Sequence, residues 1–195
     1  MTDKYSIDSH KLIFHPTRVS QWYEAQDDWN KLKKVYPIYI EITPIGSCNH
    51  RCTFCSVDYI GYKSIKQDEA ILSSRITEMS KLGVKSIMFA GEGEPTLYKA
   101  LPNILDLCTS VGIDTSLTTN AVAMNEKTTE NYVKNCKWIK VSINAGDRDV
   151  YAQIHQTKAE DFDKVIANLA MASKIKKAKN YDCTIGAQML LLPEN

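Results

Sequence analysis

The sequence has almost no excess of charge of either sign, no long apolar run, and no internal repeat or low-complexity segment. Its 24 basic and 23 acidic side chains give a formal net charge of +1, so nothing marks it as a protein that binds nucleic acid or a membrane surface. No apolar signal segment follows Met1, and no apolar run approaches the length of a membrane span. These absences predict a cytoplasmic protein, with no nucleic-acid and no membrane partner, in a reducing compartment where disulfides are rare.

The apolar pattern beyond the first 35 residues alternates between strand-like and amphipathic helix-like runs. Such alternation is typical of an α/β fold with a parallel sheet. We expect residues 1–35 to be an N-terminal extension and residues 36–195 to be the core. The expected strands are 36–44, 84–90, 113–119, 138–144 and 183–192, and the expected helices are 67–82, 99–111, one starting near 125, and 161–179.

Both ends of the chain carry a further expectation. The extension contains Trp22, Tyr23 and Trp29 in a polar setting, and we expect these aromatics to pack across the outside or the bottom of the core. The chain ends at Asn195, directly after the fifth expected strand. Because a parallel sheet needs cover at its edge, we expect the chain to be the N-terminal part of a longer protein.

The expected strands each carry one apolar and one polar face. On the fourth strand, Ile139, Val141 and Ile143 alternate with Lys140, Ser142 and Asn144. On the first strand, Ile38, Ile40 and Ile42 alternate with Tyr39, Glu41 and Thr43. On the third strand, the polar residues Ser116, Thr118 and Asn120 share one face. Side chains alternate between the two faces of a strand. The apolar faces therefore fit against helices and the polar faces fit a lumen that holds a ligand, although a solvent-exposed face of an antiparallel sheet would give the same pattern.

Three cysteines follow the first expected strand within eight residues, at Cys48, Cys52 and Cys55. Iron in a cubane cluster normally takes four sulfur ligands, so a set of three leaves one iron open. An open coordination position is a property of catalytic metal sites rather than structural ones. A zinc site is the alternative, completed by His50 or by a remote cysteine, Cys108, Cys136 or Cys183. The spacing of two residues makes His50 an awkward ligand for the same ion.

The spacing Cys-x3-Cys-x2-Cys, with Phe54 before the last cysteine, resembles the radical S-adenosylmethionine (SAM) superfamily. The resemblance covers about residues 36–195 and is closest to the branch with molybdenum-cofactor synthase and the SPASM-type enzymes. It implies a partial (β/α)6 TIM-type barrel, truncated here after about the fifth strand. It also implies a 4Fe-4S cluster held by Cys48, Cys52 and Cys55, and SAM chelated by the free iron.

The resemblance also assigns cofactor-binding residues. The segment Gly91-Glu92-Gly93-Glu94-Pro95 is similar to the Gly-Gly-Glu-Pro element that receives the SAM amino group, which implicates Gly93 and Glu94 and departs from the family at Glu92. Phe54 is expected beside the adenine. Ser142 matches the serine of a Val-Ser-x-Asp segment in which Asn144 replaces the aspartate, and Thr118 and Asn120 match a Thr-Thr-Asn-Gly segment with Ala121 in place of glycine.

Weaker candidates lie outside these motifs. Gly186, Ala187 and Gln188 on the fifth strand are candidates for contact with adenine. His155, Cys183 and Glu41 are candidate acids or hydrogen donors, for which a structural role is the simpler interpretation.

The expected function is reductive cleavage of SAM to a 5′-deoxyadenosyl radical that abstracts hydrogen from a peptide, sugar or other small metabolite. A flavodoxin or ferredoxin is the expected reductant, and the reaction could belong to the oxidoreductases, transferases or isomerases. The alternative function is an iron-sulfur or zinc binding module, such as an electron carrier, without radical chemistry.

Overall fold

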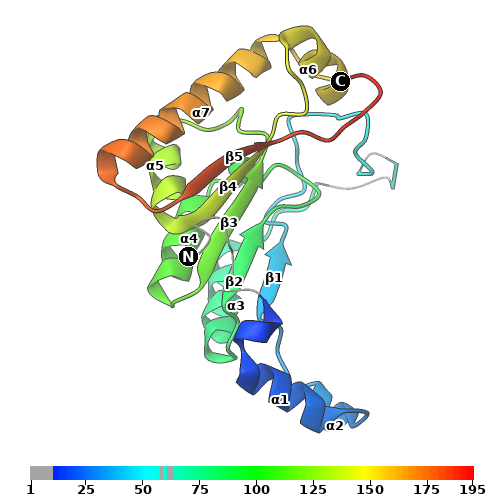
Figure 1. Cartoon of the computed structure of the whole chain (residues 1–195), viewed down its shortest axis with the longest axis vertical. Coiled ribbons are helices and arrows are strands. Elements are labelled where there is room, and N and C mark those ends of the chain that lie inside the picture. Colours follow the sequence, from blue (N-terminus) through cyan, green and yellow to red (C-terminus); the bar gives the residue numbers. More distant parts are fainter. Residues whose placement is uncertain (1–10, 58, 61–63) are drawn as a thin grey trace.

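A computed structural model gives the structure of the protein and describes residues 11–57, 59–60 and 64–195. Five strands form one sheet in their order along the chain, and every neighbouring pair is parallel. They are β1 (Tyr39–Ile42), β2 (Ser86–Phe89), β3 (Asp114–Thr119), β4 (Cys136–Ser142) and β5 (Thr184–Gln188) (Figure 1). This order is that of the wall of a partial TIM-type barrel, and it confirms the predicted α/β class.

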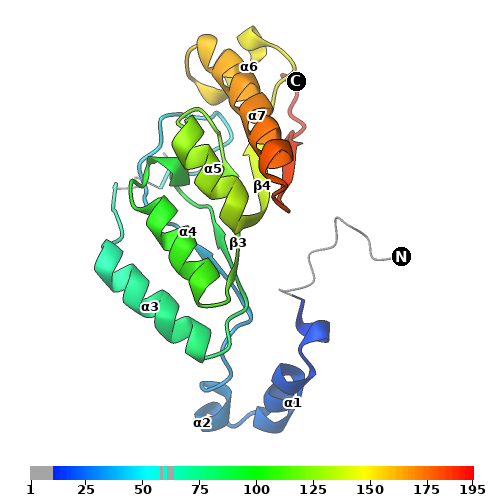
Figure 2. The ribbon, with the colours of Figure 1, turned by 90° about the vertical axis from the view of Figure 1, so that its left-hand side faces the viewer.

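Helices connect the strands and cover one face of the sheet. They are α3 (Glu69–Lys81), α4 (Leu101–Ser110), α5 (Glu126–Asn135), α6 (Arg148–His155) and α7 (Glu160–Lys179). Viewed from the side, α3, α4 and α5 lie in a row against the same face (Figure 2). A crossover helix is the usual way to join parallel strands, and it also buries the apolar face of the sheet.

The hydrophobic core lies between the sheet and these helices. Leu117 is fully buried, and Ile139 and Val141 are each 1% exposed. They pack in one cluster with apolar side chains of α3, α4 and α5 such as Ile76 and Leu105. The apolar side of each expected strand therefore faces helices, as the alternation predicts.

The opposite face of the sheet carries the polar side chains. The hydroxyl groups of Tyr39 on β1 and Thr118 on β3 lie 3.6 Å and 3.7 Å from the Sδ atom of Met88 on β2. Three neighbouring strands thus direct these side chains to one side, away from the helical layer. This confirms the predicted polar face and rules out the antiparallel alternative, because all the strands are parallel.

The predicted ends of the core strands and helices lie within four residues of the observed ones. The fifth strand ends at Gln188 instead of 192. The fourth begins at Cys136, two residues before the predicted start, because α5 ends at Asn135 and the chain enters the strand with no loop between. Cys136 is buried as the first residue of β4.

One helix, α6, was not predicted. The Asp147 carboxylate caps it by accepting hydrogen bonds from the backbone N–H groups of Asp149 and Val150, both at 2.9 Å, and Gln156 ends it in a left-handed conformation. Eight residues are too few for a clear helical period, although an N-cap aspartate ahead of apolar residues is a recognised start signal. The helix buries Tyr151 and His155, two side chains of the candidate site.

The N-terminal segment lies beside the amino ends of the first strands, with η1 (Leu12–Phe14), α1 (Pro16–Ala25) and α2 (Trp29–Leu32) (Figure 1). Arg18 attaches it by donating hydrogen bonds to the carbonyls of Tyr36 and Leu82. Trp22, Tyr23 and Trp29 are each more than half exposed, at 53%, 70% and 67%, so the expectation that they pack on the core is wrong.

The predicted N-terminal extension also includes residues 1–10, which lie outside the described residues. Within the described ranges, no helix is both long and apolar enough to cross a membrane.

Candidate cofactor site at the carboxyl ends of the strands

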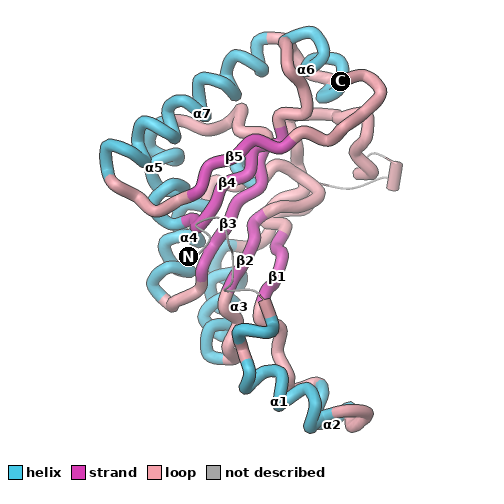
Figure 3. The backbone as a smooth tube through the Cα atoms, in the orientation of Figure 1, coloured by secondary structure: helices cyan, strands magenta, loops and turns pink. Residues whose placement is uncertain are grey.

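The loops that follow the strands collect at the end of the sheet opposite α1 and α2 (Figure 3). The cysteine loop follows β1, and Cys48, Cys52 and Cys55 are partly exposed. All three line one cavity of about 370 Å³, which falls in the range of small-molecule pockets. Its other lining residues come from the same loop and the loop after β2: Gly46, Ser47, His50, Arg51, Val57, Ser64, Gly91, Glu92 and Gly93.

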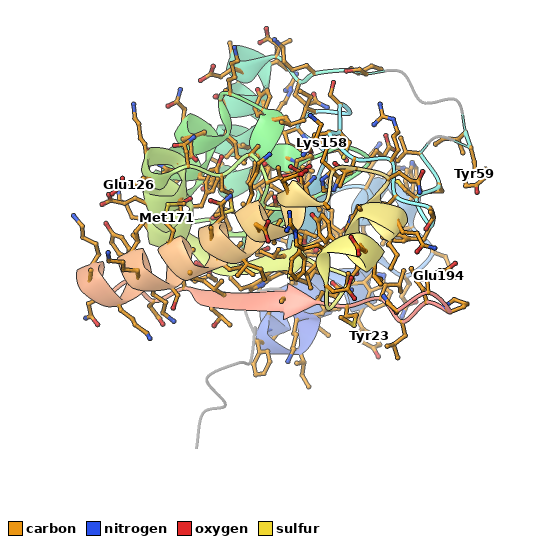
Figure 4. The ribbon with its side chains drawn as sticks, turned by 90° about the horizontal axis from the view of Figure 1, so that it is seen from above. Tyr23, Tyr59, Glu126, Lys158, Met171 and Glu194 are labelled. Atoms are coloured by element: carbon orange, nitrogen blue, oxygen red, sulfur yellow. The ribbon has the colours of Figure 1, made fainter. Side chains whose placement is uncertain are left out.

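The cysteine loop is attached to the end of α6. The backbone N–H of Arg51 donates to the carbonyl of His155 at 3.0 Å, and that of Thr53 donates to Ile154 at 2.9 Å. Cys52 Sγ lies 3.1 Å from His155 Nδ1. Figure 4 looks onto this end of the molecule, where the chain continues from the cysteines to Tyr59, which points outward and is 82% exposed. The loop therefore has a fixed base at Arg51 to Thr53 and an open outer part.

The environment of Cys48 suits a metal-bound thiolate. Burial raises the pKa of the Cys48 thiol, while a hydrogen bond from the His50 backbone N–H to Sγ, at 3.4 Å, acts in the opposite direction. A half-buried thiolate is unfavourable until a cation neutralises it, and a bound metal deprotonates a coordinating thiol outright. Three such thiols around one cavity are a donor set that fits an iron-sulfur cluster.

The remote cysteines of the zinc alternative lie elsewhere. Cys108, Cys136 and Cys183 are at most 2% exposed and belong to the hydrophobic core between sheet and helices. None of them lines the cavity of the cysteine loop. They are therefore packing residues, and Cys183 is buried away from the position expected of a hydrogen donor.

Gly93 lies where the loop after β2 crosses the start of the cysteine loop. The backbone N–H of the next residue, Glu94, donates to the carbonyl of Ser47 at 2.9 Å. A Cβ atom on Gly93 would lie 2.6 Å from both Gly46 C and Ser47 O, and closer still to Ile45 O. Only glycine permits this contact between two backbones.

We therefore expect Gly93→Ala to destabilise the protein by about 1–3 kcal/mol or more, since backbone on both sides must move. Chemical denaturation of the purified protein measures this change. Gly146→Ala is the matched control, because a Cβ there meets nothing within 4 Å. Equal stability of the two variants would show that the two loops separate without cost.

The Glu94 side chain does not face the cavity. It is 3% exposed, and its Oε1 accepts hydrogen bonds from the Thr96 backbone N–H at 3.0 Å, the Thr96 hydroxyl at 2.6 Å and the Thr119 hydroxyl at 2.5 Å. Its Oε2 accepts from the Asn120 backbone N–H at 2.7 Å. Burial raises the pKa of the Glu94 carboxyl, and the donors from Asn120, Thr119 and Thr96 act against that rise. The carboxylate thus joins the loop after β2 to the end of β3.

Asn120 extends this connection to the cysteine loop. Its side-chain Nδ2 donates to Asn49 Oδ1 at 2.8 Å, and its Oδ1 accepts from the Val122 backbone N–H at 3.0 Å. The ends of β1, β2 and β3 are therefore joined through Asn49, Asn120 and Glu94. This brings three of the predicted strand-end segments together at one site.

The remaining predicted residues lie around this point with different surroundings. Ser142 is half-buried at the end of β4, on the polar face with Thr118. Asn144 is buried, and its Oδ1 accepts from the Leu190 backbone N–H at 2.8 Å, so it fixes the chain after β5. Phe54 is 39% exposed, and its ring meets that of His155 edge-on at 6.4 Å.

Two sets of weaker candidates lie outside the cavity of the cysteine loop. Glu41 is exposed and accepts a hydrogen bond from the Tyr39 hydroxyl at 2.7 Å. Ala187 and Gln188 are exposed at the edge of the sheet, as is Gly186, and β5 pairs only with β4 in the described chain.

A cluster of ionisable side chains behind the cysteine loop was not predicted as a unit. His50 and His155 lie with ring centroids 5.1 Å apart, and Tyr151 stacks on His155 at 4.2 Å. Burial, and then the neighbouring His155, lowers the pKa of His50 to about 4, and burial lowers that of His155. The i, i+4 spacing of Tyr151 and His155 was a visible signal, but no pattern connects them to His50, a hundred residues away.

Comparison with known proteins decides the family. Residues 42–195 match the Radical SAM superfamily. The chain belongs to the radical SAM superfamily. The family uses a 4Fe-4S cluster and SAM, so the chain is related to radical SAM enzymes.

The relatives include proteins that act on nucleotides. One is an S-adenosylmethionine-dependent nucleotide dehydratase of Lacinutrix mariniflava, 32% identical over 113 residues, which cover 52% of this chain and 22% of the relative. Another is a probable GTP 3′,8-cyclase of Pyrococcus abyssi, 28% identical over 138 residues, covering 70% of this chain and 44% of the relative.

The solved structures share the fold. Streptococcus suis SuiB bound to S-adenosylmethionine matches with a TM-score of 0.63 and 20% identity, and SuiB bound to its precursor peptide SuiA matches with 0.65 and 20%. Each match covers 96% of this chain and 39% of SuiB. The chain thus spans less than half the length of each of these relatives and structures.

Proposed function

We propose that this protein is a radical SAM enzyme in which Cys48, Cys52 and Cys55 hold the 4Fe-4S cluster and the fourth iron position binds SAM. The observation that carries the proposal is the cavity lined by all three cysteines together with Gly93. The cavity lies at the carboxyl ends of parallel strands, where α/β proteins bind their ligands.

The cofactors supply the reaction, and the chain supplies position and shielding. Cys48, Cys52 and Cys55 would hold the cluster, which would supply the one electron needed to cleave a carbon–sulfur bond of SAM into methionine and a 5′-deoxyadenosyl radical able to take a hydrogen atom from the substrate. Gly93 and the Glu94 backbone would receive the SAM amino group, and the lack of a side chain at Gly93 lets their loop pack against the cysteine loop. Phe54 would flank the adenine.

Polar side chains on the open face of the sheet would complete the SAM site. Thr118 and Ser142 lie on that face. Asn120 connects this face to the cysteine loop, because its side chain donates a hydrogen bond to Asn49. Asn144 would act by holding the segment after β5 beside the cofactor. In this assignment residues 36–195 form the radical SAM core and residues 1–35 an extension of it.

We propose a peptide or a small metabolite as the substrate and a flavodoxin or ferredoxin as the electron donor. SuiB, with its bound precursor peptide, supports the first choice, and the nucleotide enzymes among the relatives support the second. A reducing cytoplasm suits both the thiols and the cluster.

The test is anaerobic reconstitution of the chain with iron and sulfide, followed by SAM and dithionite. We expect 5′-deoxyadenosine and methionine in equal amounts, measured by liquid chromatography. Omitting dithionite is the control and should remove both products. A loaded cluster that forms no 5′-deoxyadenosine from SAM would contradict the proposal.

A further inference from the structure

The imidazole of His50 is buried without a hydrogen bond. Its side chain is 1% exposed, and within the part of the chain that the structure describes neither ring nitrogen has a hydrogen-bond partner. The nearest carboxylate oxygen, Asp161 Oδ2, lies 3.6 Å from Nε2, too far for a hydrogen bond. A buried polar group without a partner is uncommon and costs free energy, and a site for a bound ion is one of its recognised explanations.

Two further metal-ligating groups lie next to this imidazole. One donor atom each from His50, Cys52 and His155 lies within 4.8 Å of the others. The three residues come from two distant parts of the chain, the cysteine loop and the end of α6. The short spacing between His50 and Cys52 made His50 an awkward ligand in the sequence, but in the fold their donor atoms are close enough to bind one ion.

The surroundings of His155 leave its Nδ1 atom as the ring nitrogen with a lone pair. Its Nε2 lies 3.0 Å from the carbonyl oxygen of Ile143, an atom that can only accept a hydrogen bond. The ring hydrogen is therefore on Nε2, and the lone pair of Nδ1 points at Cys52 Sγ, 3.1 Å away. A metal-bound histidine commonly has this arrangement, in which the second ring nitrogen donates to a backbone carbonyl.

The Asp161 carboxylate lies beside the His50 ring, on the side of Nε2. Its two carboxylate oxygens accept hydrogen bonds from the Thr157 hydroxyl and the Lys164 ammonium, both at 2.7 Å. Burial would raise the pKa of Asp161, but these bonds lower it on balance. Because both oxygens already have partners, Asp161 is placed to orient the His50 ring rather than to bind the ion itself.

We infer that the cluster-free protein binds one Zn²⁺ ion through His50, Cys52 and His155. Two imidazoles and one thiolate are a donor set that zinc prefers, and three protein ligands leave the fourth tetrahedral position to water. The Cys52 thiol loses its proton to solvent as the Zn–S bond forms. Since Cys52 is also a cluster ligand in the proposed function, zinc and the 4Fe-4S cluster exclude each other.

The inference goes beyond the proposed function and makes a different demand on the cysteines. A zinc ion bound by Cys48, Cys52 and Cys55 would need all three thiols and no histidine. The ion inferred here needs only one of them. The two sites therefore differ in the number of sulfur ligands, which spectroscopy reports directly.

The first experiment counts these ligands in the unchanged chain. Apoprotein purified anaerobically is titrated with Co²⁺, the usual optical substitute for zinc, and the sulfur-to-cobalt charge-transfer band is compared with tetrahedral reference complexes. We expect one bound ion per chain, four-coordinate, with the band intensity of a single thiolate. An intensity corresponding to two or three thiolates would overturn the inference, as would the absence of binding.

The second experiment uses variants and Zn²⁺ itself, with a competing chelating dye. His155→Ala and His50→Ala are expected to weaken zinc binding by roughly 10- to 100-fold, whereas the double variant Cys48→Ala/Cys55→Ala is expected to bind within about threefold of the unchanged chain. Circular dichroism confirms that each variant is folded. Zinc binding that is lost in the double variant and kept in His155→Ala would contradict the inference.

The two proposals fail separately. Cluster assembly with 5′-deoxyadenosine formation, but no single-thiolate zinc site, would reject only the inference. Zinc binding through His50, Cys52 and His155 without SAM cleavage by the reconstituted chain would reject only the proposed function.

Discussion

Replacing any one of Cys48, Cys52 and Cys55 with serine is expected to abolish the 4Fe-4S cluster and, with it, SAM cleavage. Each thiol is one of only three protein ligands in the proposed site, and all three line the same cavity. A hydroxyl is a poor ligand for iron in a cluster, so the loss should exceed about 100-fold in 5′-deoxyadenosine formation. Iron and sulfide content and the absorption of the reconstituted protein measure cluster loss directly.

The matched control for these variants is Cys183→Ala. Cys183 is fully buried in the hydrophobic core and does not line the cavity. Truncating it should cost about 1 kcal/mol of stability, through lost packing, and leave the cluster in place. A Cys55→Ser protein that keeps a full complement of iron and sulfide would refute the assignment of the three ligands.

The second large effect is expected from Glu94→Gln. The carboxylate accepts four hydrogen bonds from three residues, and an amide of the same shape places an NH₂ group against one of those donors. Unpairing a buried donor and losing charge-assisted bonds should destabilise the protein by about 2–4 kcal/mol. Urea denaturation followed by circular dichroism gives the change in the free energy of unfolding.

The same substitution should also loosen the cofactor site. Glu94 holds the end of β3 at Asn120, and Asn120 holds Asn49 in the cysteine loop. Glu92→Gln is the control, because Glu92 stands two residues earlier in the same loop and is exposed. We expect Glu92→Gln to change stability by less than about 0.5 kcal/mol. If both variants were equally stable, Glu94 would not be the connection between the strand ends.

The sheet could be predicted from the sequence because its pattern is local. Ile139 and Val141 alternate with Lys140 and Ser142, and a period of two residues states directly which side of the strand faces the core. The convergence of the strand ends follows from that, since parallel strands place their carboxyl ends at one edge. The cysteine spacing then predicts which edge holds the metal.

The side-chain connections within the site could not be predicted in the same way. Glu94 was predicted to lie near the cofactor, but the sequence gives no sign that its carboxylate turns inward to Thr119 and Asn120, because this depends on the packing of two loops. The contact of His155 with Cys52 spans 103 residues. Such a contact is set by tertiary structure alone, and α6, which carries His155, is too short to show a clear period.

The aromatics of the N-terminal segment show the limit of composition as a guide. Trp22, Tyr23 and Trp29 are large and apolar, which predicts burial on average. Their helices are short and project from the end of the sheet, and all three side chains remain more than half exposed (Figure 1).

The most direct test of the central claim is the electron paramagnetic resonance spectrum of the reduced, reconstituted protein with and without SAM. A cluster held by three cysteines has one iron that SAM can chelate, so adding SAM should change the g values of the reduced cluster. The account predicts this change in the unchanged chain and in Cys183→Ala. A reduced 4Fe-4S spectrum that SAM leaves unaltered would contradict it.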